Sequence, residues 1–291
     1  MNHHRQNATW LGAVLGTISA LLVLALAAHA SDRRGDYTEE FHQTYAISAD
    51  GRVELDNING DVHISSWDQN QIKVDAVKYA DSKEKLDEAK IEVESGKDYF
   101  SIRTKYRDHD HWGSHHNNPA SIEYTLTVPR NIRLDEIKLI NGALDINGVS
   151  GEVRASCING RLEAKNLAGR TKLSTINGQL NAQFDRLSES SVELDSVNGE
   201  VEATIPSDSK AEIEASTVSG SIHNDFGLHV NNHKFVGHDL RGELGSGGAH
   251  IKMSNVNGRI ELRHAQDGRA ISPVKDLSHH DRNSDDDDSE I

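Results

Sequence analysis

The residues best suited to bind a metal ion form one short run, Asp108-His109-Asp110-His111-Trp112-Gly113-Ser114-His115-His116. Its candidate ligands are two carboxylates and four imidazoles: Asp108, His109, Asp110, His111, His115 and His116. These groups suit Zn²⁺, Cu²⁺ or Ni²⁺. Their spacing fits no closed structural zinc site, and a polar loop between two strands has the same composition. The run therefore indicates either a transition-metal site or a solvated loop that holds no cofactor.

A second set of chemically capable side chains follows a repeated glycine by three residues. The set is His63, Asp145, Glu163, Asn181, Glu202, His223 and Glu261. In a stacked fold, Asp145 and Glu163 would lie about one strand spacing (~4.8 Å) apart and could share a cation. Polysaccharide-cleaving solenoids cluster acids and a base in one groove, and no unusual spacing marks such a pair here. Because charged residues ordinarily occupy an outward face, we expect a solvated surface and no catalytic residues.

The glycines belong to an internal repeat, in which an apolar residue is followed by Asn or Ser and then Gly. The copies are Ile58-Asn59-Gly60, Ile140-Asn141-Gly142, Ile158-Asn159-Gly160, Ile176-Asn177-Gly178, Val197-Asn198-Gly199, Val218-Ser219-Gly220 and Val256-Asn257-Gly258. From Gly142 to Gly220 the glycines are 18 or 21 residues apart. Solenoid units of this length bury their apolar side only by stacking on one another. Since Gly supplies positive φ and Asn bonds neighbouring backbone, the repeat predicts a structural ladder of stacked turns.

Apolar and polar residues alternate on both sides of each turn. Val53 and Leu55 precede the first turn, and Val62 and Ile64 follow it. This period of two predicts a strand with one buried face on each side. We therefore predict an all-β fold, a parallel β-solenoid (β-helix or β-roll) with about 18–22 residues per coil, right-handed like most parallel crossovers. The calcium-binding β-roll is disfavoured because its double glycines and regular Asp are missing.

The segments beside the repeats have other patterns. Residues 37–130 contain one isolated repeat, several strand-like stretches and one short helical stretch, which predicts a β-rich N-terminal cap continuous with the solenoid repeats of residues 131–265. Residues 266–291 end in an acidic run and are predicted to be a disordered tail. The single cysteine, Cys157, stands where other repeats have a small turn residue, so we expect a buried structural thiol.

The N-terminus has the features of a signal peptide, residues 1–30. Arg5 precedes an uncharged apolar run over residues 11–28, and Ala28-His29-Ala30 fits a signal peptidase site. This pattern predicts cleavage after Ala30 and a folded part in the periplasm or outside the cell, whereas an uncleaved run would be a membrane anchor. The formal net charge of −15 argues against nucleic acid and anionic lipid as partners.

The repeats, together with Val53-Glu54-Leu55-Asp56-Asn57-Ile58-Asn59-Gly60-Asp61-Val62 and Tyr124-Thr125-Leu126-Thr127-Val128-Pro129, resemble the bacterial "putative adhesin" domain family over about residues 45–265. The resemblance implies a β-solenoid domain of the cell envelope and supplies no catalytic residues. Residues 106–118 and the acidic tail depart from the family pattern.

These observations together predict a non-enzymatic, adhesin-like envelope protein that binds a protein or glycan through its solenoid faces. A periplasmic transition-metal-binding protein that uses residues 108–116 is the alternative, and a polysaccharide-active enzyme ranks below both. The sequence identifies neither the partner nor the oligomeric state.

Overall fold

The structure is a computed structural model that describes residues 36–106, 119–187, 191–233 and 237–277. The predicted signal peptide, the His-rich run and residues 278–291 lie outside these ranges. Within them the fold is all-β apart from one short helix, α1 (Lys83–Glu88), which Ser82 caps by accepting a hydrogen bond from the Lys85 amide. No helix of the described part is long and apolar enough to cross a membrane.

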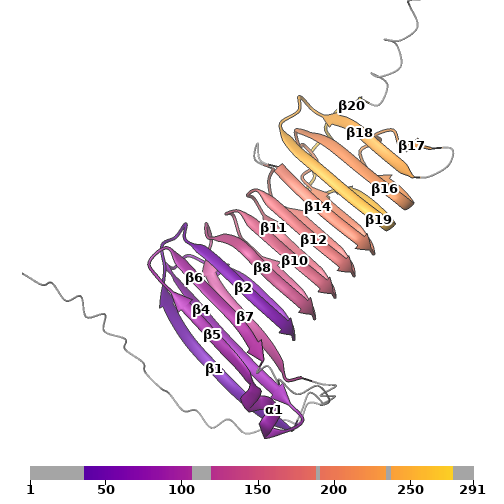
Figure 1. Ribbon diagram of the computed structural model, residues 1–291. Helices are drawn as coiled ribbons and strands as arrows, with labels where there is room; N and C mark the ends of the chain where they lie inside the picture. Colours follow the sequence, from indigo (N-terminus) through magenta and orange to yellow (C-terminus); the bar gives the residue numbers. More distant parts are fainter. Residues whose placement is uncertain (1–35, 107–118, 188–190, 234–236, 278–291) are drawn as a thin grey trace, which may run out of the picture. The chain divides into compact units, whose positions relative to one another are not determined.

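The strands form two rows, and most neighbours in each row are parallel (Figure 1). The first row, called row A, is in spatial order β5 (Ala89–Ser95), β6 (Tyr99–Tyr106), β2 (Arg52–Asn59), β8 (Arg133–Asn141), β10 (Val153–Asn159), β12 (Thr171–Asn177), β14 (Ser191–Asn198), β19 (Ala249–His264), β16 (Ala211–Asn224), β18 (His238–Leu244) and β20 (Val274–Asp276). β17 (Asn231–Asn232) also pairs with β18.

The second row, called row B, receives the chain after each Asn-Gly turn. It contains β1 (Tyr37–Ala46), β4 (Gln71–Ala80), β7 (Ser121–Pro129), β3 (Val62–Trp67), β9 (Leu144–Asn147), β11 (Leu162–Leu167), β13 (Leu180–Phe184), β15 (Val201–Ile205) and the later parts of β19 and β16. Alternate residues of both rows are buried, as at Leu173 in β12 and Leu180 in β13. The apolar alternation of the sequence therefore lines one continuous core.

The turns between the rows stack so closely that only glycine fits at the corner. A Cβ atom on Gly178 would lie 1.8 Å from the carbonyl oxygen of Gly160, and a Cβ on Gly160 would lie 1.8 Å from that of Gly142. The φ angles of Gly160 and Gly178 are 151° and 153°, which side chains rarely adopt. The Gly160 amide donates to the Asn177 carbonyl at 3.0 Å, so the close approach also continues the backbone ladder.

The order of the coils along the stack differs from their order in the sequence. The Gly60 coil, β2 and β3, lies directly beside the Gly142 coil, β8 and β9, although residues 68–132 separate them in the sequence. At the other end β19 lies between β14 and β16, since Ile251 pairs with both Val192 and Ile213 (Figure 1). The last repeat in the sequence is therefore inserted between the two repeats that precede it.

Antiparallel strands and a buried polar network close the N-terminal end of the stack. β5 pairs antiparallel with β6, and β1 and β4 continue row B in the same way. The fully buried Asn57 amide donates to the Ile122 carbonyl at 2.9 Å and accepts from the Thr104 hydroxyl at 2.9 Å. Thr104 in turn lies 2.8 Å from the Tyr124 hydroxyl, and burial raises the pKa of Tyr124. These contacts satisfy polar groups that would otherwise be costly to bury.

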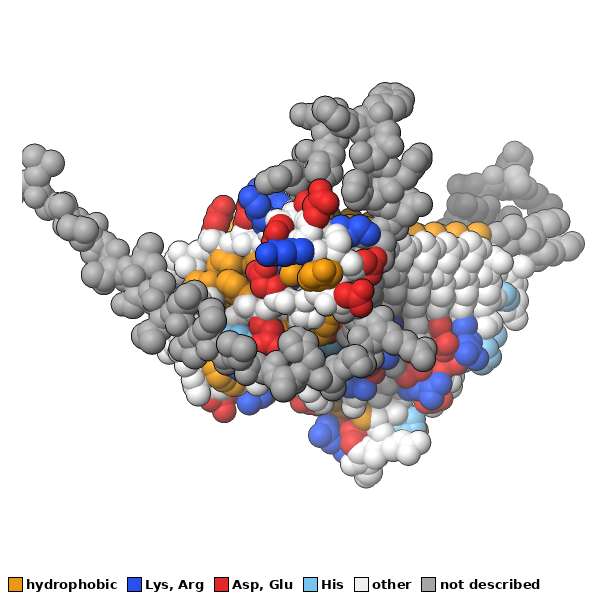
Figure 2. Space-filling model, turned by 90° about the horizontal axis from the view of Figure 1, so that it is seen from below, with side chains coloured by type: hydrophobic (Ala, Val, Ile, Leu, Met, Phe, Trp, Pro, Cys, Tyr) orange, Lys and Arg blue, Asp and Glu red, His pale blue; other side chains and the backbone are white. Residues whose placement is uncertain are grey.

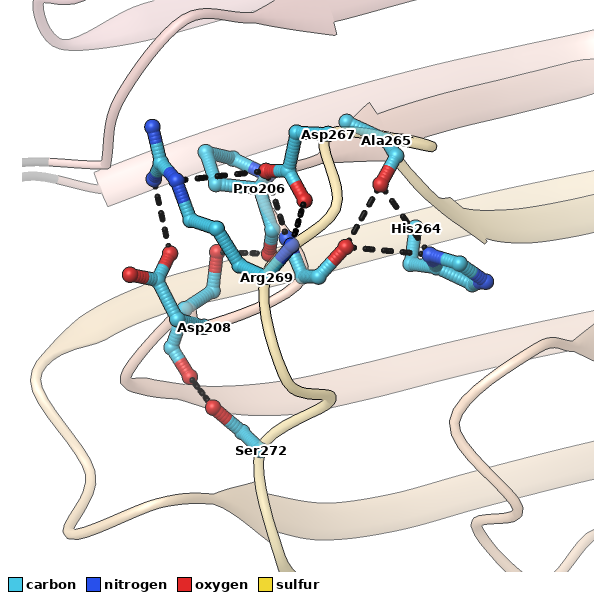
Figure 3. A network of polar contacts seen from close by, with 9 residues as sticks. Pro206, Asp208, His264, Ala265, Asp267, Arg269 and Ser272 are labelled. Atoms are coloured by element: carbon cyan, nitrogen blue, oxygen red, sulfur yellow. Dashed lines mark hydrogen bonds and ion pairs between the residues drawn. The ribbon is translucent and has the colours of Figure 1, made fainter.

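The prediction that the chain is disordered from residue 266 is wrong for residues 266–277. Ser272 donates through its amide to the Ser207 carbonyl at 2.9 Å and through its hydroxyl to the Ser209 carbonyl at 2.7 Å (Figure 3). Arg269 donates to Asp208 at 2.8 Å, and β20 then pairs with β18. Polar contacts with the turn at 206–209 order this segment, and a search for apolar periodicity does not detect such contacts.

The substitution Gly178→Ala should lower the free energy of unfolding by about 4 kcal/mol or more, because it adds both a backbone clash and an unfavourable φ. Gly227→Ala is the matched control: its φ is also positive, at 82°, but nothing lies within 4 Å of the added Cβ. We expect the control substitution to lower the free energy of unfolding by about 1–2 kcal/mol. Urea unfolding measures both values, and equal losses would show that close stacking does not constrain the turn.

Candidate binding surface

Five aliphatic side chains form a column on the outer face of row A. In stack order they are Ile158 of β10, Ile176 of β12, Val197 of β14, Val256 of β19 and Val218 of β16, with 37%, 43%, 39%, 42% and 52% of their surfaces exposed. Residues on either side pair in register, such as Thr175 with Ser196 and Asn177 with Asn198, so the side chains follow one line. We call this set the aliphatic column. It contains the apolar residue of four Asn-Gly repeats and of the one Ser-Gly repeat.

An open groove runs beside the aliphatic column. Its other wall is a column of small polar residues, Ser156, Ser174, Asp195, Ser254 and Ser216, and its volume is about 630 Å³. Among the described residues that line it, Asp195 is the only Asp, Glu, Lys, Arg or His. Burial raises the pKa of Asp195, and the negative charge of Glu193 adds to the shift. The groove is thus a long, nearly uncharged surface feature.

Side-chain amides form a hydrogen-bonded ladder on the side of the aliphatic column toward the turns. Nδ2 of Asn177 donates to Oδ1 of Asn159 at 2.9 Å, and Asn198 donates to Asn177 at 3.0 Å. The ladder continues from Asn59 through Asn141 to Asn159 and from Asn198 to Asn257. Figure 2 shows a row of hydrophobic side chains that borders a wide field without charged groups. Aliphatic, amide and glycine columns together give this edge its uncharged character.

Cys157 lies beneath this surface and is not a reactive group. Its side chain is 1% exposed, and its thiol donates weakly to the Gly142 carbonyl at 3.6 Å. Burial raises the pKa of the thiol to about 11, which keeps it protonated and unreactive at neutral pH. Asn255, at the same position of another coil, donates to the Gly199 carbonyl at 2.7 Å. Cys157 and Asn255 therefore both bond the backbone of the turns.

The outward column of row B contains the carboxylates that could have shared a cation. Asp145 and Glu163 are direct neighbours in the β9–β11 pair. However, Asp145 lies 2.9 Å from His63 and 3.0 Å from Arg161, while Glu163 lies 2.5 Å from the Lys165 ammonium. Basic side chains therefore already surround both acids, and the geometry is that of a solvated ion-pair surface.

A closer acidic cluster comes from residues that lie far apart in the sequence. Carboxylate oxygens of Glu200, Glu202 and Glu261 all lie within 4.8 Å of one another. Arg259 bridges Glu200 and Glu261 at 3.2 and 3.0 Å, and Arg263 contacts Glu202 at 3.3 Å as well as Glu261. Two guanidinium groups therefore take the place that a cation would need. Spacing in the sequence does not reveal the cluster, because Glu202 and Glu261 become neighbours only when β19 pairs with β15.

The His-rich run lies outside the described residues, between β6 and β7. Its six candidate ligands, residues 108–111 and 115–116, therefore stay a prediction. Asn181 and His223, the remaining members of the outward column, belong to β13 and β16. Asn181 donates to Glu202 at 3.4 Å.

These features define an all-β, solenoid-like protein with a regular outer surface. Residues 131–263 match the family model described as Toastrack DUF4097, and this match confirms the resemblance to the putative adhesin domain family that the sequence predicted. A comparison with curated proteins gives no match.

Solved structures similar to this chain include three distant ones. A "putative cell adhesion protein" from Clostridium sporogenes has 11% identity and a TM-score of 0.42, covering 79% of this chain and 100% of its own. A "putative adhesin" from Bacteroides fragilis has 9% identity and a TM-score of 0.36, covering 78% and 97%. A "putative lipid binding protein" from Parabacteroides distasonis has 13% identity and a TM-score of 0.33, covering 79% and 98%. We draw nothing about function from similarities this distant.

Replacing both Arg259 and Arg263 with Gln should convert the acidic cluster into a cation site. We expect the double variant to lose about 1–3 kcal/mol of stability, between the values for exposed and buried ion pairs, because three carboxylates are left together. Millimolar Ca²⁺ should restore its melting temperature and leave that of the unsubstituted protein unchanged. The control is Lys105→Gln, which breaks the exposed pair of Lys105 and Glu92. This variant should not lose comparable stability, and Ca²⁺ should not raise its melting temperature. Stabilisation of the unsubstituted protein by Ca²⁺ would contradict the assignment.

Proposed function

We propose that this chain is an exported, non-catalytic, adhesin-like interaction protein of the cell envelope, and that it binds another envelope component through the outer face of its solenoid. The observation that carries the proposal is the aliphatic column with its groove. Ile176, Val197 and Val256 expose 39–43% of their surfaces in one continuous line. Contiguous exposed apolar surface on a soluble domain is characteristic of an interaction site.

The burial and hydrogen bonds of the polar side chains support a role without catalysis. Within the described part of the chain, one Ser–His hydrogen bond joins the Ser207 hydroxyl to Nδ1 of His264 at 3.0 Å (Figure 3). Ser207 is 1% exposed, and its hydroxyl also donates to the Ala265 carbonyl at 2.5 Å. A nucleophile must reach its substrate, whereas this hydroxyl fastens the chain after β19 to the turn at 206–209.

The location and the partner expected from the sequence belong to the same proposal. Export rests on the apolar run at 11–28 and the site at Ala28-His29-Ala30. A protein or a glycan was the expected partner, and the periplasm and the cell surface are both compatible with export. The uncharged groove narrows this choice, because it disfavours strongly ionic partners.

The alternative function, transition-metal binding, depends on residues 108–116. Calorimetric titration of residues 31–291 with Zn²⁺, Cu²⁺ or Ni²⁺, beside a variant without residues 107–118, separates the two proposals. Saturable sub-micromolar binding lost with the deletion would favour metal handling. Millimolar or unsaturable binding would leave the interaction protein as the account.

A photoreactive residue placed at Val256 should form covalent adducts in the intact host cell. The control position is Lys252, which projects from the same face of the same strand but lies outside the groove. Adducts should form at position 256 in clear excess over position 252, and mass spectrometry identifies them. Equal yields at both positions, or none at position 256, would remove the groove as the binding surface.

A further inference from the structure

We infer that the groove beside the aliphatic column binds one extended, uncharged acyl chain. This inference rests on the proposed function and names the chemistry of the ligand at that surface. The aliphatic column supplies the apolar wall, and the small residues Ser156, Ser174, Ser254 and Ser216 leave room along the other side. Three further arguments select this occupant: charge, length and area.

The charge distribution favours an uncharged ligand. In β10 and β12 the basic groups lie near the beginning of the strand and are paired, Arg154 with Asp135 at 3.0 Å and Lys172 with Glu193 at 2.8 Å. Among the described residues of the groove itself, Asp195 is the only Asp, Glu, Lys, Arg or His. With a net charge of −15, the chain also repels anionic head groups. A hydrocarbon chain with an uncharged head group complements this surface.

The length of the groove suits a single acyl chain. The five aliphatic side chains come from consecutive strands at about 4.8 Å spacing, so the first and last lie about 19 Å apart. The hydrocarbon core of a bilayer is about 30 Å thick, which makes one leaflet about 15 Å. A volume of about 630 Å³ also falls in the range of small-molecule sites. The groove can therefore accept an acyl chain of ordinary membrane length along most of its extent.

The narrow apolar area disfavours a second copy of the chain or another protein. A stable protein interface buries about 800 Å² on each partner. The aliphatic column is one side chain wide, and its members expose between 37% and 52% of their surfaces. A glycan fits less well for another reason: the serine wall can bond its hydroxyl groups on one side only, and those on the other side would lose water against the aliphatic column, which offers no hydrogen bonds.

The test measures binding of saturated monoacylglycerols of increasing chain length to the purified chain, by displacement of a fluorescent acyl probe below aggregation concentrations. Full burial of a methylene group, ~0.8 kcal/mol, corresponds to about a fourfold gain in affinity, so an open groove should give about twofold per methylene. Affinity should rise with chain length and level off once the groove is filled. Affinity that does not depend on chain length would overturn the inference.

Substitutions in the groove locate the binding. Val256→Asn and Val197→Asn should each weaken binding roughly fivefold, because half-buried aliphatic contacts are lost. Val274→Asn is the matched control, since Val274 is also 42% exposed but lies in β20, outside the groove. Ser254→Trp fills the groove and retains the aliphatic column, and it should also abolish binding. Equal weakening by Val274→Asn would overturn the inference.

The outcome also separates this inference from the proposed function. Protein or glycan adducts at position 256, without any acyl-chain binding, would overturn the acyl-chain assignment and leave the groove as an interaction surface. Absence of both adducts and acyl binding would overturn both. Chain-length-dependent binding that Val256→Asn weakens and Val274→Asn does not would support both.

Discussion

The close approach of backbone to backbone where the turn glycines of neighbouring coils stack constrains all other parts of the structure. Each turn glycine from Gly160 onward stands where a Cβ would lie 1.8–1.9 Å from the glycine carbonyl of the neighbouring coil. No side chain can be accommodated at that distance, so the coils stack at one spacing and in one register. The Asn ladder beside the glycines repeats the register with side-chain hydrogen bonds of 2.8–3.0 Å. Any property repeated in the sequence then becomes a continuous stripe in space.

Each column of repeated residues has its own role in the structure. Inward columns such as Leu173 with Leu194 build the core, and outward charged columns pair within themselves. The aliphatic column is different, because its side chains are neither buried nor paired with a described partner. Strand propensity favours β-branched residues, but Thr would satisfy that preference without exposing hydrocarbon. The repeated choice of Ile or Val next to the turn is therefore better explained by contact with a ligand than by the needs of the strand.

The local sequence pattern predicted the strands and turns but not the order in which the coils stack. The alternation around Gly160 and Gly178 is sufficient to predict two strands and a tight turn, because both depend on adjacent residues. The insertion of β19 between β14 and β16 could not be predicted, since all repeats resemble one another and pair equally well in principle. For the same reason, the sequence did not predict that Glu202 and Glu261 lie close together. The residue four positions after the repeat glycine is apolar in every copy except one, where it is Asn224. This exception has a local reason, because the Asn224 side chain bonds the Leu228 backbone at 2.8 and 2.9 Å.

The order of coils at the C-terminal end is the most direct test of the account, because the aliphatic column is continuous only if Val256 lies between Val197 and Val218. Paired cysteines at positions 198 and 257 should form a disulfide on mild oxidation, since neighbouring coils bring these residues within disulfide range. Paired cysteines at positions 198 and 219 should not, because the β19 coil separates them. A disulfide between 198 and 219, with none between 198 and 257, would contradict the stacking order and the continuous groove that depends on it.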